Sequence, residues 1–148
     1  MDAIGLLILR LGMGALMLTH GWGKAQMLIA GEFEKFPDPL GMGQTMSLVG
    51  AAGAEVGGAL LVMVGFLTRL GALSVAFTMG VAAFVIHGAD PWFMGPGVSA
   101  SKEPALTLLI VFLAIALTGA GRFSLDAKLF GGKGGDSSPP KDAAKDPA

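Results

Sequence analysis

The chain has 148 residues, a length that suits one domain. Apolar residues make up 53 % of it and charged residues only 14 %, below the share of about a quarter that is usual for soluble domains. The formal net charge of −1 excludes a basic nucleic-acid-binding surface, and the absence of cysteine excludes disulfides, thiolate metal sites and iron–sulfur clusters held by this chain.

Four apolar stretches have roughly the 17–25 residues that a helix needs to cross a bilayer. They cover residues 3–22, 45–67, 70–86 and 104–120. The first begins without a basic segment and contains Arg10, which favours a membrane span over a signal peptide. The sequence therefore predicts an all-α membrane protein, with an antiparallel four-transmembrane-helix bundle as a single domain over residues 1–130.

The connections between these stretches differ in character. Residues 23–44 contain Pro37-Asp38-Pro39-Leu40-Gly41, a turn-rich sequence that cannot be helical throughout. The connection at Thr68-Arg69 is very short and predicts a tight antiparallel hairpin. Residues 131–148 carry no large apolar side chain and predict a disordered tail.

An even number of spans places both termini on the same side of the membrane. The basic residues expected on that side are Arg69, Arg122, Lys128 and Lys133. Those expected on the opposite side are Lys24, Lys35 and Lys102. The excess of positive charge predicts cytoplasmic termini, in a protein of the inner (cytoplasmic) membrane.

Ionisable side chains at membrane depth are costly unless they are paired or hydrated. Arg10 and Glu55 are expected at depths of roughly 18 Å and 15 Å from the outer ends of their spans, at 1.5 Å per residue. The similar depths predict an Arg10–Glu55 pair, formed directly or through water, that acts as a structural lock. Arg69 and Asp126 form a second predicted ion pair, which ties the hairpin to the C-terminal segment.

A second polar group is expected at the outer ends of the spans. His20 and Lys24 are one helical turn apart, His87 ends the third span, and Lys102-Glu103 precedes the fourth. Antiparallel topology brings these residues to one side and predicts a polar cavity there. Because the chain has only two histidines and no obvious third ligand, the sequence predicts no metal site. If the histidines bind no ligand, their expected role is hydrogen bonding to the backbone or to interfacial water.

Four stretches carry a resemblance to the DoxX family, from Leu7 to Leu129. They are Leu9-Arg10-Leu11-Gly12 leading to His20-Gly21-Trp22-Gly23-Lys24; Phe36-Pro37-Asp38-Pro39-Leu40-Gly41; Glu55-Val56-Gly57-Gly58 with Gly65-Phe66-Leu67-Thr68-Arg69-Leu70; and Lys102-Glu103-Pro104-Ala105 with Thr118-Gly119-Ala120-Gly121-Arg122-Phe123-Ser124-Leu125-Asp126. Ala120 is a departure, because the family often has proline there. The resemblance implies a four-helix membrane fold and a link to quinol oxidases and thiosulfate:quinone oxidoreductases.

The resemblance predicts an integral membrane accessory subunit of a quinone-linked oxidoreductase system. Such a subunit has no intrinsic cofactor, can bind quinone, and receives electrons from a membrane or peripheral redox partner. His20, Lys24 and His87 are the candidate quinone-binding residues. Glu103, with His20 and Lys24, is the candidate catalytic group that exchanges protons with the quinone. Because a carboxylate beside an arginine stays ionised, Glu103 suits proton exchange better than Glu55 does.

Two other functions are consistent with the same sequence. A non-catalytic scaffold would bind another membrane subunit or a second copy of the chain through glycine-rich faces such as Gly53-x-x-x-Gly57. A carrier of protons or small solutes would use the charged core, but four spans without an internal inverted repeat would need to oligomerise. A quinone that co-purifies with the protein distinguishes the first function from the other two.

Overall fold

The computed structural model describes residues 3–129. This part of the chain consists of helices and loops and contains no strand. Its elements are α1 (Ala3–Ala30), the 3₁₀ turn η1 (Phe33–Lys35), α2 (Gln44–Ala52), the π-helix η2 (Gly53–Gly58), α3 (Ala59–Val64), α4 (Thr68–Val81), the π-helix η3 (Ala82–Ile86), α5 (Glu103–Thr118) and α6 (Leu125–Leu129). The tail predicted for residues 131–148 lies outside the described residues.

Within the part of the chain that the structure describes, three continuous helical segments are long and apolar enough to cross a membrane. They are Ala3–Ala30, Gln44–Val64 and Thr68–Ile86. α5 is also apolar but has only 16 residues, which corresponds to about 24 Å at 1.5 Å per residue. The all-helical class of the prediction is thus confirmed, while the fourth span and the four-helix transmembrane bundle stay predictions.

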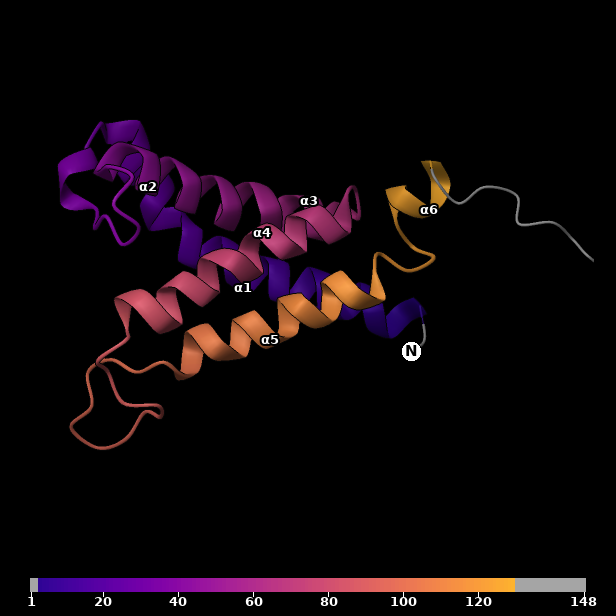
Figure 1. The fold of residues 1–148 in the computed structure, drawn as a ribbon. Helices are drawn as coiled ribbons and strands as arrows, with labels where there is room; N and C mark the ends of the chain where they lie inside the picture. The colour runs from indigo at the N-terminus through magenta and orange to yellow at the C-terminus, as the bar shows by residue number, and fades with distance from the viewer. Residues whose placement is uncertain (1–2, 130–148) are drawn as a thin grey trace, which may run out of the picture.

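The long helices run alternately in opposite directions (Figure 1). α1 runs away from the N-terminal end, α2–α3 returns, α4 runs outward again, and α5 returns alongside α4. The start of α1 and the short α6 therefore lie at one end of the molecule. The loops of residues 31–43 and 87–102 lie at the opposite end, which we call the loop end.

α1 is eight residues longer than the span predicted from hydropathy, because it ends at Ala30 and not at residue 22. The sequence after Trp22 is less apolar but contains no proline, so nothing interrupts the backbone hydrogen bonding. The next residue, Gly31, has a φ of 71°, the left-handed conformation common just after a helix C-terminus. Hydropathy located the end of the apolar run and not the end of the helix.

The backbones of α4 and η2, the π-helix of the preceding helical segment, approach each other unusually closely. A Cβ atom built on Gly58 would lie 2.9 Å from the carbonyl oxygen of Gly71, and one built on Gly71 would lie 2.8 Å from that of Gly58. Only glycine allows this backbone approach. Further toward α5, the buried core consists of Met17, Val62, Val75, Phe112, Ile115 and their neighbours.

Candidate functional site

Arg10 is buried in α1 with only 1 % of its surface exposed. Its Nε donates to the carbonyl of Val62 at 2.8 Å and its Nη2 to that of Met63 at 3.0 Å. Its Nη1 donates to the carbonyls of Phe123, at 3.1 Å, and Ala120. The Val62 and Met63 carbonyls belong to the last turn of α3, where helix geometry leaves them without intrahelical partners. Arg10 therefore joins α1, the end of α3 and the segment after α5.

The predicted Arg10–Glu55 pair is wrong. The Glu55 side chain is 1 % exposed, and its Oε2 lies 2.5 Å from Nζ of Lys24. The cause is the longer α1: Arg10 lies about 20 residues, or roughly 30 Å, from the outer end of its helix, whereas Glu55 lies roughly 16 Å from the start of α2. Lys24, which was expected at the membrane surface, is the basic residue at the level of Glu55.

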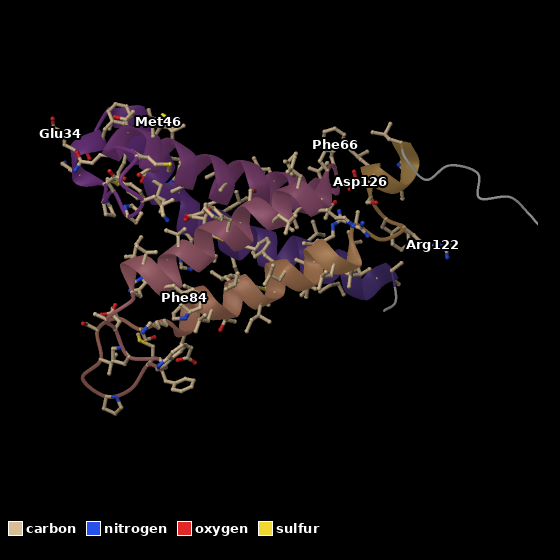
Figure 2. The ribbon with its side chains drawn as sticks, viewed as in Figure 1. Glu34, Met46, Phe66, Phe84, Arg122 and Asp126 are labelled. Atoms are coloured by element: carbon tan, nitrogen blue, oxygen red, sulfur yellow. The ribbon has the colours of Figure 1, made fainter. Side chains whose placement is uncertain are left out.

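The predicted Arg69–Asp126 pair is also wrong, because no such ion pair occurs in residues 3–129. The Asp126 carboxylate instead accepts the N–H groups of Leu67 at 2.7 Å and Thr68 at 2.9 Å. The Asp126 N–H donates to the carbonyl of Gly65 at 2.8 Å. Asp126 thus fixes the turn before α4 through hydrogen bonds with backbone groups and not through an ion pair with Arg69. Figure 2 shows Asp126 near Phe66, a residue of this turn.

The environment of Asp126 favours its charged form. Burial alone would raise the pKa of this carboxyl group. The hydrogen bonds from the Thr68 and Leu67 N–H groups and the positive charge of Arg10 outweigh burial and hold the pKa below its ordinary value. Asp126 is therefore ionised at neutral pH. A negative charge is favourable there, because the carboxylate faces the N-terminus of α4.

A cavity of about 640 Å³ opens at the loop end, between α1, α2–η2, α4–η3 and the start of α5. Most of its lining is apolar and includes Leu40, Met42, Met46, Phe77, Met79, Ile86 and Leu108. Its polar lining residues are His20, Lys24, Ser47, Glu55, Ser74, Thr78, His87, Ser99 and Ser101. The volume and the mostly apolar wall with a few polar groups are typical of small-molecule sites.

Both π-helices border this cavity. η2 contributes Ala54 and Glu55, and η3 contributes Ala82 and Ile86. A π-turn widens a helix by one residue and frequently occurs at functional sites. The two π-helices found in residues 3–129 thus both lie at the cavity, and η2 carries the buried Glu55 carboxylate.

The structure brings His20, Lys24 and His87 to one cavity, but not Glu103 or Lys102. The Glu103 carboxylate is in an exposed residue and accepts the N–H of Met94 at 2.9 Å. The Lys102 ammonium donates to the carbonyls of Gly88 at 2.8 Å and Asp90 at 3.0 Å. Both residues therefore fasten the loop of residues 87–102 over the side of the cavity.

The loop of residues 31–43 is fixed by Asp38. Its carboxylate accepts the Ser47 hydroxyl at 2.7 Å and the N–H groups of Gly43 at 2.7 Å and Met42 at 3.0 Å. The Ser47 and Gly43 hydrogen bonds are the main reasons why the pKa of Asp38 lies below its ordinary value. This holds the loop, which contributes Leu40 to the cavity lining, against the start of α2.

Sequence reasoning missed two cavity-side residues, Asp90 and Ser101. Asp90 Oδ2 lies 2.7 Å from Nδ1 of His87, and the spacing His87-x-x-Asp90 was a readable signal for that pair. The Ser101 hydroxyl is buried and has no hydrogen-bond partner among the described residues, which no sequence pattern indicated. Within residues 3–129, no group of three histidine, aspartate or glutamate side chains is arranged to hold a metal ion.

Comparisons with known proteins place the chain among membrane proteins. The DoxX family model matches residues 5–88. The inner membrane protein YqjF of Escherichia coli is 33 % identical over 138 residues, covering 87 % of this chain and 95 % of the relative. A Haemophilus influenzae protein described only as uncharacterized is 29 % identical over 130 residues, covering 84 % and 90 %. No solved structure matches the chain. The predicted resemblance is confirmed: this membrane protein belongs to the DoxX family.

Proposed function

We propose that the protein is an inner-membrane accessory subunit of a quinone-linked redox system, and that the cavity at the loop end binds the quinone. The observation that carries the proposal is the mostly apolar cavity of about 640 Å³ with the Lys24–Glu55 pair in its wall. A membrane-dissolved quinone needs an apolar slot and a few hydrogen-bond donors for its ring carbonyls. The description of the Escherichia coli relative as an inner membrane protein supports the location.

Lys24 is the main candidate donor. Its ammonium group has three hydrogens, and one is directed to Glu55. The other two are available to a ligand carbonyl in the cavity. His20, one turn earlier on α1, lines the same cavity and offers a ring nitrogen as a second hydrogen-bonding group. Glu55 balances the lysine charge and fixes its position. Since burying the Glu55 carboxylate costs desolvation free energy, a role in binding explains why the cavity wall contains this ion pair.

Reduction of a bound quinone also requires a source of protons and a source of electrons. Glu103 lies outside the cavity but precedes Pro104, which lines it, and its residue is exposed. The Glu103 carboxylate is the group that exchanges these protons with water near the cavity. Electrons are supplied by a protein partner.

The first test is the small-molecule content of the purified protein. The wild type, extracted in mild detergent, is expected to carry quinone, and Lys24→Met and His20→Ala are expected to lose it several-fold. Glu103→Ala should still bind quinone, because its carboxylate does not line the cavity. Lys128→Met, in α6, is the matched control for removal of a lysine charge. Equal quinone in the wild type, Lys24→Met and His20→Ala, or none in the wild type, would contradict the proposal.

A second candidate function is a scaffold for another membrane helix, and one observation favours it. Gly50, Gly53 and Gly57 form an open stripe along α2–η2, because a Cβ atom at any of them would meet no other described residue within 4 Å. Such a stripe allows close approach of a helix from outside the chain. Gly53→Leu would then reduce the yield of a co-purifying subunit or of a homo-oligomer. No quinone together with that loss would favour the scaffold.

A further inference from the structure

The loop of residues 87–102 contributes two polar side chains to the cavity that the proposed quinone contacts leave unused. His87 and Ser101 both line it. Ser101 is 4 % exposed, and its hydroxyl has no partner among residues 3–129. Leaving a buried hydroxyl without a hydrogen-bond partner is unfavourable. A hydroxyl retained in the wall of a cavity is therefore accounted for if a bound molecule supplies the missing hydrogen bond.

Asp90 determines which hydrogen bond His87 can offer. The Asp90 carboxylate lies 2.7 Å from Nδ1 of His87, and a carboxylate can only accept. In a neutral imidazole the hydrogen is then on Nδ1, and Nε2 is left as an acceptor. The group that suits His87 is thus a donor, such as a ligand hydroxyl, whereas Lys24 on the other wall suits a carbonyl.

The loop is held in a fixed conformation that keeps these groups in place. The buried Lys102 ammonium bonds the carbonyls of Gly88 and Asp90 and lies 4.8 Å from the centre of the Trp92 ring. The Lys102 N–H also donates to the carbonyl of Pro91 at 2.9 Å. Lys102, the neighbour of Ser101, thereby joins the two ends of the loop, and this favours binding because few groups need to be ordered by the ligand.

We propose that His87, oriented by Asp90, and Ser101 form a subsite that recognises a hydroxyl group on the ring of a lipophilic ligand. The inference rests on the proposed quinone function and extends it: the site binds the reduced, hydroxyl-bearing ring. His87 accepts the ligand hydroxyl hydrogen, and Ser101 bonds the same oxygen or its neighbour. Asp90 is a positioning residue, because it acts through the tautomer of His87.

The test compares two stable probes, 4-butylphenol and its methyl ether 4-butylanisole. Titrated calorimetrically into the purified protein, with detergent blanks subtracted, the phenol should bind the wild type about tenfold more tightly. Asp90→Asn should reduce that ratio to about one while anisole binding is retained, because an amide can donate to Nδ1 and turn Nε2 into a donor. Ser101→Ala should reduce the ratio several-fold. Glu32→Gln, an equivalent change in the other loop, should leave the ratio unchanged.

A second measurement does not depend on how the Asp90 variant folds. The chain has no cysteine, so Ser99→Cys introduces a single thiol at an exposed residue of the cavity wall and leaves Ser101 intact. A small maleimide should label this thiol, and 4-butylphenol should slow the labelling more than 4-butylanisole does. Thr107→Cys, on an exposed residue of α5 outside the cavity, should be labelled at the same rate with either probe.

The outcomes separate the two proposals. If the wild type carries quinone but binds phenol and anisole equally, the hydroxyl subsite is overturned and the quinone cavity stands. If the wild type carries no quinone and binds neither probe, both are overturned. A phenol preference that Asp90→Asn leaves unchanged removes the positioning role of Asp90 and overturns the inference.

Discussion

Two basic residues of α1 are drawn into the protein, and the structure satisfies them in different ways. Arg10 faces four backbone carbonyls from two other segments, which a planar guanidinium with five N–H groups can reach together. Lys24 faces a single carboxylate, which suits a compact ammonium group. Arg10 lies at the end of the molecule opposite the cavity, so its role is to hold segments together, whereas Lys24 lines the cavity.

Replacing Arg10 is expected to destabilise the fold. Arg10→Ala leaves the carbonyls of Val62, Met63, Ala120 and Phe123 without this donor and should lower the free energy of unfolding by about 3 kcal/mol or more. Arg10→Lys should give an intermediate loss, since an ammonium cannot span all four. Thermal unfolding in detergent measures both, with Arg122→Ala, an exposed arginine, as the control. An Arg10→Ala protein as stable as the control would show that these hydrogen bonds are not needed.

At the scale of elements, α4 depends on a side chain that is distant in sequence. Gly65 and Leu67 both have positive φ, at 76° and 47°, so the turn before α4 is sharp. Asp126 of α6 accepts the N–H groups at the start of α4, where a helix has unpaired donors. α6 has only five residues and no buried one, so this contact explains its place at the hairpin.

This contact predicts a dependence of stability on pH. The folded-state pKa of Asp126 is lower than its ordinary value, so its contribution to stability is complete above about pH 4 and is lost as the pH falls through the folded pKa. Asp126→Asn should lower the free energy of unfolding by about 1 kcal/mol at neutral pH. The difference from the wild type should shrink in acid, as unfolding measured from pH 7 to pH 3 would show. A constant difference would mean that the charge is unimportant.

The close contact between α4 and η2 predicts that stability depends on glycine at this contact. A Cβ atom at Gly58 would lie 2.7 Å from the Ser74 hydroxyl and 2.9 Å from the Gly71 carbonyl oxygen. Gly58→Ala should therefore destabilise the protein by about 1–3 kcal/mol. Gly57→Ala, where the Cβ atom would meet nothing within 4 Å, should be neutral or slightly stabilising. Equal melting temperatures for the two variants would contradict this close packing.

At the scale of the whole molecule, the start of α1 and α6 lie at one end (Figure 1). The residues that line the cavity lie toward the opposite, loop end. The distribution of basic residues favours a cytoplasmic location for the end that carries α6. The cavity, with its two loops, would then face the outer side of the inner membrane. We would then expect the protein partner that supplies electrons to the quinone to act on that side.

Single cysteines test this orientation, because the chain has none of its own. In intact cells, a membrane-impermeant maleimide should label Gly95→Cys, in the loop of residues 87–102, and should not label Lys128→Cys in α6. Permeabilised cells should give labelling of both, which controls for accessibility. The opposite pattern in intact cells would place the cavity on the cytoplasmic side.

Local chemistry predicted much of the architecture. The apolar runs gave the helical class, and the expected bounds of 45–67 and 70–86 lie close to the observed Gln44–Val64 and Thr68–Ile86. Alternation of direction along the chain was enough to bring His20, Lys24 and His87 to the same end. These properties depend on composition and on the short Thr68-Arg69 connection, so a single sequence contains them.

The tertiary structure alone decided which polar groups meet. Arg10 and Glu55 were expected to pair, but α1 continues to Ala30 and places Lys24 at the level of Glu55. The relative positions of two helices depend on packing between distant residues, such as the approach of Gly21 to Glu55, and not on the hydropathy of either helix. The sequence by itself therefore determined that buried charges exist in this membrane protein, while their partners, and the cavity that Lys24 and Ser101 share, follow from helix packing.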